Sequence, residues 1–229
     1  MRIYKNFPEA MSEIKRDVVE MGIKAHPKTY QDKYIGNDAG FETMELQNYI
    51  YTVVNPVKEE LNPNQPWADA EWLERLQGMN GKIVNPGQAW KLRKEVWEEF
   101  LDEKGKFAYT YGERFCLCDQ VQNIIDRIKV DPESRQLFIT VWNPSDSYKL
   151  GGVSRVPCSL GYQIQIRKGG LNLTYLQRSA DVVTHFTNDV YLAFRMQEHI
   201  AGCTGYKIGT YTHWIGSLHT FKKDSQGVF

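Results

Sequence analysis

The sequence predicts an α+β protein that folds as one domain, residues 1–229. A chain of 229 residues suits one domain, since a hydrophobic core keeps growing up to a couple of hundred residues before chains divide. Stretches with helical periodicity alternate with runs of β-branched and aromatic residues, and a glycine turn joins two of these runs. We therefore expect a β-sheet packed with helices.

The N-terminal third is predicted to fold as helix, loop, strand and helix. Asn6, followed by Pro and Glu in the first turn, predicts a helix that Gly22 ends. Residues 24–40 are polar and typical of a loop, whereas residues 46–54 alternate aromatic and β-branched side chains as a strand does. Residues 66–77 begin with Pro and precede Gly, as a second helix would. The apolar stripe expected in the first helix is Met11, Ile14, Val18 and Met21.

The middle of the chain is predicted to contain two longer helices and a strand. Residues 86–102 should form a helix with Trp97 and Phe100 on one face. Residues 113–130 should form the next helix, and residues 137–142 read as a strand because they are rich in β-branched and aromatic residues. The inward positions expected in the second of these helices are Val121, Ile124, Ile125 and Ile128.

A predicted β-hairpin brings a cysteine and an arginine together. Residues 160–167 and 171–176 read as strands, and residues 168–170 (Lys-Gly-Gly) have turn chemistry. Cys158 enters the first strand and Arg178 leaves the second, so antiparallel pairing places them close together. A nearby arginine favours the thiolate, which is the reactive form of cysteine. A buried structural cysteine is the alternative for a lone Cys.

The C-terminal part is predicted as a buried helix and a strand. Residues 188–203 carry the helical pattern, and residues 207–215 alternate as a strand that leads to Gly-Ser-Leu-His at 216–219. His199 and Cys203 have a spacing that suits a metal, but no third ligand is evident, so we expect no metal site. The expected core positions of the helix are Val190, Tyr191, Phe194 and Ile200.

Composition limits the classes of partner. With 28 basic and 28 acidic residues, the chain has no net field that would attract nucleic acid or an anionic membrane, although a few local arginines suffice for a small anion. The N-terminus lacks an apolar signal core, and no run approaches the roughly eighteen apolar residues that span a bilayer. Four cysteines without metal spacing predict reduced thiols and a cytoplasmic location.

Several segments, in the same order along the chain, resemble the thymidylate synthase family of pyrimidine-nucleotide carbon-5 transferases. The segments are EWLERLQG, VWEEFLDEKGKFAYTYGERF, DPESRQLFITVWN, RVPCSLGYQIQI, LNLTYLQRSADVV, FTNDVYLAF and WIGSLHTF. The resemblance implies a thymidylate synthase-like α+β fold, with a mixed β-sheet packed with helices and a sheet face that forms a homodimer interface. It also implies 5,10-methylenetetrahydrofolate as cofactor and a pyrimidine nucleoside monophosphate as substrate.

The resemblance implies three catalytic residues. Cys158 would add through its thiolate to carbon 6 of the pyrimidine and so make carbon 5 nucleophilic. Glu71 matches the family's catalytic carboxylate and would orient water and relay protons. Tyr111 matches a phenol that helps to relay the proton leaving carbon 5. Glu74 stands where the family usually has Trp.

The resemblance also implies binding residues. Arg178 would hold the nucleotide phosphate and Ser179 would donate a further hydrogen bond, next to Gln177 in the same substrate cradle. His219 matches a contact to a sugar hydroxyl. Arg135 would reach across a homodimer to the partner's phosphate, where the family's second arginine is replaced here by Gln. Two further residues, Trp97 and Asp181, match contacts to the folate.

One position is expected to select the base. Counted without gaps from residues 177–181, the residue that reads the pyrimidine edge is Asp189, where thymidylate synthases have Asn. A carboxyl group that accepts from N4 and shares a proton with N3 fits cytosine. Together with the stretches RSADVV, FTND and GSLH, this position makes the chain resemble deoxycytidylate and cytidylate hydroxymethylases. Two alternatives stay open: Asp189 is only an acid in a helix first turn, or the reader is Asn188, one position earlier.

The expected function is therefore 5-hydroxymethylation of dCMP or CMP by addition of water. Ser179 favours dCMP, whereas Phe221 replaces a family Tyr that helps to bind the sugar. The chain also ends soon after His219, and a missing C-terminal lid suits water addition better than hydride transfer. The alternatives are a thymidylate synthase-type methylase of dUMP or dCMP, and a catalytically silent nucleotide-binding homologue.

Overall fold

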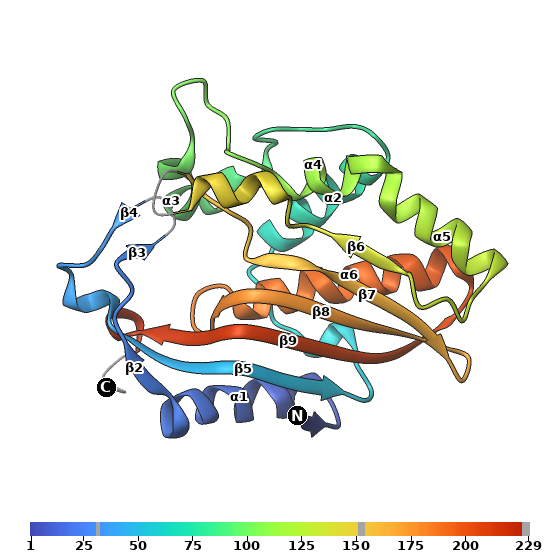
Figure 1. The fold of residues 1–229 in the computed structure, drawn as a ribbon, viewed down its shortest axis with the longest axis horizontal. Coiled ribbons are helices and arrows are strands. Elements are labelled where there is room, and N and C mark those ends of the chain that lie inside the picture. Colours follow the sequence, from blue (N-terminus) through green and yellow to red (C-terminus); the bar gives the residue numbers. More distant parts are fainter. Residues whose placement is uncertain (31–32, 151–153, 226–229) are drawn as a thin grey trace.

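A seven-stranded mixed sheet organises the molecule (Figure 1). The structure is a computed structural model that describes residues 1–30, 33–150 and 154–225. The helices are α1 (Phe7–Met21), α2 (Trp67–Met79), α3 (Lys94–Trp97), α4 (Tyr111–Cys116), α5 (Gln120–Val130) and α6 (Phe186–Thr204). The strands are β1 (Arg2–Tyr4), β2 (Ile23–Ala25), β3 (Thr29–Tyr30), β4 (Lys33–Tyr34), β5 (Thr43–Val53), β6 (Phe138–Thr140), β7 (Ser159–Arg167), β8 (Gly170–Asp181) and β9 (Lys207–Phe221).

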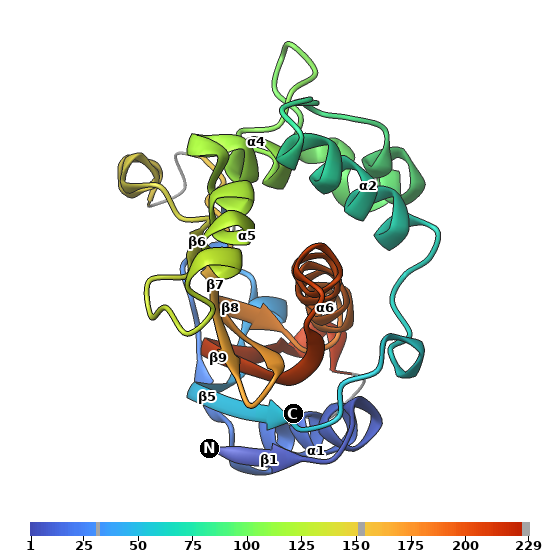
Figure 2. The same cartoon turned by 90° about the vertical axis from the view of Figure 1, so that its right-hand side faces the viewer.

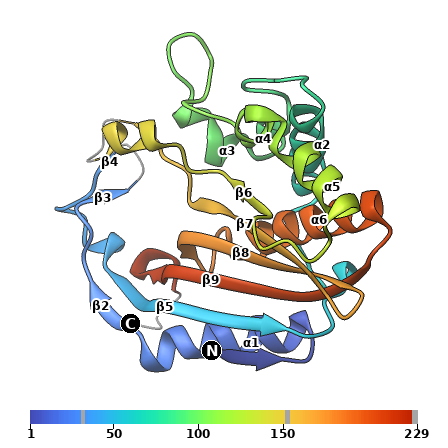
Figure 3. The same cartoon turned by 45° about the vertical axis from the view of Figure 1, so that its right-hand side comes forward.

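The main sheet has the strand order β1-β5-β9-β8-β7-β6, and β2 pairs with β5 beyond this path. The pairs β1–β5 and β8–β9 are parallel, whereas β5–β9, β7–β8 and β6–β7 are antiparallel. Figure 3 shows β5, β9 and β8 running side by side as the long central strands. The predicted α+β class with a mixed sheet packed with helices is confirmed.

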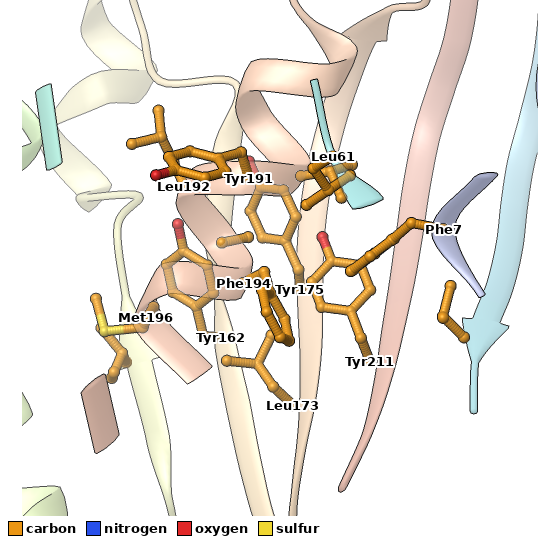
Figure 4. Packing of buried hydrophobic residues seen from close by; sticks show 14 of the residues in the cluster. Phe7, Leu61, Tyr162, Leu173, Tyr175, Tyr191, Leu192, Phe194, Met196 and Tyr211 are labelled. Atoms are coloured by element: carbon orange, nitrogen blue, oxygen red, sulfur yellow. The ribbon is translucent and has the colours of Figure 1, made fainter. Parts of the chain in front are cut away.

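Helix α6 forms the centre of the core. It lies between the sheet and helices α2 and α5 (Figure 2). Tyr162, Tyr175 and Tyr211 project from three neighbouring strands toward α6, where they form a fully buried aromatic layer (Figure 4). Helix α1 adds to the same layer, because Phe7 packs edge-on against Tyr211 at a centroid distance of 5.5 Å. The alternate residues of these strands stay half-buried on the other side of the sheet.

The first helix and the hairpin form for the predicted reasons. Asn6 Oδ1 accepts a hydrogen bond from the main-chain N–H of Glu9, which caps α1, and Ile14 and Val18 are buried. Met21 was expected in the core but is 48 % exposed. In the β7–β8 turn, Lys168 and Gly169 have φ of 51° and 74°, as a two-residue hairpin turn requires.

The predicted single helix over residues 86–102 is wrong. The chain instead makes a 3₁₀ segment (Ala89–Arg93), the short α3 and another 3₁₀ turn. The Glu74 carboxylate, which lies on α2, accepts hydrogen bonds from the main-chain N–H groups of Gln88 and Ala89, so a tertiary contact fixes where this region begins. Trp97 ends α3, and its ring still meets Phe100 at a centroid distance of 6.3 Å.

The predicted helix over residues 113–130 is broken in two. A capping box between Thr110 and Glu113 starts α4 at Tyr111, two residues early. Cys118 and Asp119 then take φ of 55° and 49°, which interrupts the helix before α5. The four apolar positions predicted to face inward in α5 are buried. Residues 24–40, predicted as a loop, contain the short strands β2, β3 and β4 in their described part.

Candidate active site

A cavity of about 610 Å³ opens where α2, α4 and the start of α6 meet the ends of β8 and β9. Most of the side chains that the sequence singled out line this one cavity. They are Glu71, Trp97, Tyr111, Cys158, Arg178, Ser179, Asp181, Asp189 and His219. Segments far apart in the sequence therefore supply one concave site, the usual form of a small-molecule site.

Cys158 directly precedes β7 and lies against Arg178 of β8, as predicted. Arg178 Nη2 is 3.9 Å from Cys158 Sγ, and the same guanidinium donates hydrogen bonds to the carbonyl oxygens of Val156 and Pro157. Burial raises the pKa of the Cys158 thiol, while Arg178 opposes that rise. The arginine therefore favours the thiolate, but its charge does not outweigh the cost of burying the sulfur away from solvent.

Glu71 and Tyr111 meet through Arg75. Arg75 Nε donates to Glu71 Oε1 at 3.0 Å, four residues away on α2, and the guanidinium lies 4.0 Å from the centre of the Tyr111 ring. Arg75 is 5 % exposed, so its charge is held in place by these two contacts. The sequence predicted no role for Arg75, although its i,i+4 spacing from Glu71 is a signal that could have found it.

A short chain of hydroxyl groups continues from Tyr111 into the sheet. Tyr111 Oη is 3.1 Å from Ser159 Oγ, which is 2.5 Å from Tyr175 Oη. Burial raises the pKa of Tyr111 well above its ordinary value, so the phenol keeps its proton at neutral pH. Tyr111 is thus able to donate and accept a hydrogen bond at the cavity wall.

The first turn of α6 turns Asp189 toward the cavity and Asn188 away from it. Asn188 is 5 % exposed, and its Oδ1 accepts a hydrogen bond from the main-chain N–H of Asn64 at 2.7 Å. Asp189 Oδ2 accepts one from Gln177 Nε2 at 2.7 Å, and Gln177 itself is buried beneath the cavity wall. Burial raises the pKa of Asp189 to about 6, against the lowering effects of Gln177 and Arg75.

Asp181 and His219 stand opposite each other on β8 and β9. Asp181 Oδ1 accepts from the main-chain N–H groups of Val183 and Thr184, which shapes the turn that leads to α6. Burial lowers the pKa of His219, so its ring is neutral at pH 7. Arg135, in contrast, is exposed and lies outside the cavity, and its reach to a partner subunit stays a prediction.

One wall of the cavity is aromatic. Trp97 stacks on Trp67 with ring centroids 5.9 Å apart and an interplanar angle of 17°. The indole N–H groups of Trp90 and Trp97 are buried without a hydrogen-bond partner among the described residues. A flat heteroaromatic cofactor that accepts hydrogen bonds fits such a wall, because it would stack on the rings and satisfy the orphaned donors.

Besides Arg75, the lining residues Arg155 and Tyr30 were also missed from the sequence. Arg155 lies with its guanidinium 4.3 Å from the centre of Phe100 and 5.0 Å from that of Trp97. The sequence feature that could have identified Arg155 is its position three residues before Cys158. Tyr30 of β3 packs edge-on against Phe221 at a centroid distance of 5.4 Å, and burial raises its pKa to about 12. No sequence pattern pointed to Tyr30, which lies in a stretch predicted as loop.

Within the described residues, no three His, Cys, Asp or Glu side chains gather at a spacing that would hold a metal ion. The pair with metal-like spacing, His199 and Cys203, has its Nε2 and Sγ atoms 4.0 Å apart. In the same part of the chain, no helix combines the length and apolar character needed to cross a membrane.

A half-buried cysteine beside an arginine, with carboxylates and an aromatic wall around one cavity, defines a candidate site for covalent catalysis on a small anionic substrate. The chain belongs to the thymidylate synthase family, because the family model described as "Thymidylate synthase" matches residues 85–228. The fold is similar to that of thermostable thymidylate synthase A from Bacillus subtilis, with a TM-score of 0.74 and 23 % sequence identity over 97 % of this chain and 82 % of the other.

Membership of this family gives the general type of reaction, and the structural likeness confirms the predicted fold. The protein is a pyrimidine one-carbon transferase of the thymidylate synthase family with that family's fold. The family uses methylenetetrahydrofolate, binds nucleoside monophosphates and is typically dimeric. The division into one domain, the homodimer interface on a sheet face, the cytoplasmic location and the residue roles stay predictions. The predicted lack of a lid concerns the chain end, where residues 226–229 lie outside the described part.

Proposed function

We propose that the protein is a hydroxymethyltransferase that acts on carbon 5 of a cytosine nucleotide, dCMP or CMP, with 5,10-methylenetetrahydrofolate. The observation that carries the proposal is the Asp189 carboxyl on the cavity wall, with its pKa raised to about 6. Near neutral pH such a group exchanges a proton readily, so it both accepts from N4 of cytosine and donates to N3. The Asn188 alternative is less suited, because the Asn188 amide is occupied by Asn64.

Contacts in the cavity support the catalytic roles that we propose. Its thiolate adds to carbon 6 of the pyrimidine, and Arg178 lowers the cost of forming that thiolate. Glu71, held by Arg75, orients a water molecule and moves protons at the reacting carbon. Tyr111, whose hydroxyl is held by its contact with Ser159, helps to relay the proton that leaves carbon 5.

The cofactor supplies the one-carbon unit that carbon 5 receives. Trp97 and Trp90 would hold its rings at the aromatic wall, where their indole N–H groups, which have no partner among the described residues, could donate to it, and Asp181, which lines the same cavity, would contact the pterin. Water addition leaves a hydroxymethyl group, whereas hydride transfer leaves a methyl group. Glu71, which Arg75 holds at the cavity wall, is the group that would orient the water molecule for the first of these outcomes.

The remaining roles concern the phosphate, the sugar and the partner subunit. Arg178 and Ser179 bind the phosphate, and neutral His219 contacts a sugar hydroxyl. Gln177 holds the base-reading carboxyl in place from below. In a homodimer formed through the half-buried face of the sheet, exposed Arg135 reaches the phosphate in the partner's site.

A second candidate is a methylase of dUMP or dCMP, which the likeness to a thymidylate synthase in fold supports. Mass spectrometry of the products separates the candidates. The protein is incubated with 5,10-methylenetetrahydrofolate and, separately, dCMP, CMP, dUMP or UMP, with Cys158→Ser as control. We expect a hydroxymethyl product on a cytosine nucleotide with the wild type alone. A methyl product, or activity on dUMP alone, supports the methylase, and no product with any substrate supports a silent nucleotide-binding homologue.

A further inference from the structure

A buried chain of hydrogen bonds runs from the core to the base-reading carboxyl. Tyr51 Oη is 3.2 Å from His213 Nδ1, His213 Nε2 is 3.0 Å from Gln177 Oε1, and Gln177 Nε2 is 2.7 Å from Asp189 Oδ2. Tyr51, His213 and Gln177 come from the adjacent strands β5, β9 and β8, and each is 0 % exposed. Asp189 is the last residue of this series of hydrogen bonds, and it is the one that lines the cavity.

In each hydrogen bond of this series, the donor is the residue farther from Asp189. An ionised carboxylate only accepts, so Gln177 presents its amide nitrogen to Asp189 and its carbonyl oxygen to His213. His213 must then carry its hydrogen on Nε2, which leaves a lone pair on Nδ1. Tyr51 donates its hydroxyl hydrogen to that lone pair.

The ring of neutral His213 carries one N–H hydrogen, on either Nδ1 or Nε2. Its imidazole is stacked between Tyr175, at 4.5 Å and 26°, and Phe186, at 5.8 Å and 7°. Burial lowers the pKa of His213 well below its ordinary value, so the ring stays neutral. A neutral imidazole is a donor at one nitrogen and an acceptor at the other. The tautomer of His213 therefore fixes which residue donates in every hydrogen bond of the series.

The opposite direction is disfavoured at the Tyr51 end. If His213 carried its hydrogen on Nδ1, Tyr51 would accept that hydrogen and its own O–H would lack an acceptor among the described residues. An unpaired donor in a buried site loses its interaction with water and gains nothing in return. The core therefore sets the tautomer of His213.

We propose that His213 is a positioning residue that fixes which oxygen of Asp189 presents a hydrogen to the base. This inference rests on the proposed reading of cytosine by Asp189. Because Gln177 donates to Oδ2, a proton on the carboxyl resides on Oδ1, where it donates to N3 of cytosine while Oδ2 still accepts from N4. In the reversed chain the proton would lie between Oδ2 and Gln177, and the carboxyl would offer N3 no hydrogen.

The first test needs no ligand. ¹⁵N NMR of the free protein, labelled at histidine, reports which ring nitrogen carries the hydrogen, and the signals of His213 are assigned by their loss in His213→Phe. We expect a neutral ring protonated on Nε2. A ring protonated on Nδ1, or a charged ring, would overturn the inference whatever the protein's activity.

The second test measures base discrimination. Calorimetry gives the affinities of dCMP and dUMP, without cofactor, for the wild type, His213→Phe, His213→Gln and Tyr51→Phe. His213→Phe keeps a flat ring but removes the donor, so Gln177 is free to turn over. We expect the dCMP preference to fall by about tenfold, roughly the worth of one hydrogen bond, and His213→Gln, which keeps an amide donor, to restore most of it. His199→Asn is the matched control, because His199 lies outside the cavity and takes no part in this series of hydrogen bonds.

The outcomes distinguish a failure of the role proposed for His213 from a failure of the proposed function. Equal losses of affinity for both nucleotides in His213→Phe would show a merely structural role and would overturn the inference. If the wild type itself does not prefer dCMP, the proposed function fails, while the NMR measurement still decides the direction of the chain. Tyr51→Phe is expected to shift the preference in the same direction as His213→Phe, and it supplies this comparison if His213→Phe does not fold.

Discussion

Arg178 reaches Cys158 from the neighbouring strand, with Nη2 3.9 Å from Sγ. Its guanidinium also donates to the carbonyl oxygens of Val156 and Pro157, so one side chain holds the segment that carries the cysteine and places a positive charge beside it. A phosphate bound by Arg178 would share this charge. Substrate binding and activation of the nucleophile are thus linked through one residue.

The first prediction concerns the reactivity of Cys158. Because burial raises the pKa of Cys158 and Arg178 opposes the rise, Arg178→Gln should move the pH midpoint of alkylation upward by about one unit. Peptide mass spectrometry after timed iodoacetamide treatment measures it, with exposed Cys203 as internal control. An unchanged midpoint would mean that Arg178 does not influence the thiol.

The second prediction concerns stability against pH. The pKa of Asp189 is about 6 in the folded protein, above the ordinary 3.8, so its favourable contribution is complete below about 4 and is lost as the pH rises through about 6. Asp189→Asn does not titrate. Its Tm should equal that of the wild type near pH 4 and exceed it by a few degrees above pH 6.5, and a constant difference at all pH values would contradict the raised pKa.

The third prediction concerns the contact of α2 with α4. A Cβ at Gly78 would lie 2.4 Å from main-chain atoms of Gly112, so Gly78→Ala should cost about 1–3 kcal/mol and should disturb the placing of Glu71 and Tyr111. At Gly202, inside α6, a Cβ would meet no atom of the described residues within 4 Å beyond its chain neighbours and the adjacent backbone of its own helix, so Gly202→Ala should stabilise by about 0.5–1 kcal/mol. Urea unfolding of both variants checks these opposite signs.

The fourth prediction concerns Tyr111. Removing its hydroxyl breaks the contact to Ser159 but leaves the ring under Arg75. Tyr111→Phe should bind nucleotide with nearly unchanged affinity and lose turnover by about 10²–10⁴, the range for a proton-transfer group. Steady-state kinetics and calorimetry give the two quantities. Tyr148→Phe, at an exposed position, should change neither, and a loss of affinity equal to the loss of rate would indicate binding instead.

The sequence was informative where local rules decide the structure. The hairpin turn at Lys168 and Gly169 follows from turn chemistry, and the closeness of Cys158 and Arg178 follows from the hairpin. The cap at Asn6 and the buried stripe of α5 are equally local.

Tertiary contacts account for what the sequence missed. The segment after residue 86 is not one helix, because Glu74 on another helix binds its first N–H groups. Strand alternation places His213 in the core, but its partners Tyr51 and Gln177 come from strands whose register no local pattern gives. The choice between Asn188 and Asp189 depended on the helix phase.

The central claim, that Asp189 selects a cytosine base, is tested most directly by the ratio of kcat/KM for dCMP to that for dUMP, measured in the wild type and in Asp189→Asn with 5,10-methylenetetrahydrofolate. An amide matches the uracil edge and mismatches cytosine, so we expect a ratio above one in the wild type and below one in the variant, a change of about 10² or more. The same ratio in both proteins would contradict the assignment of Asp189 as the residue that reads the base.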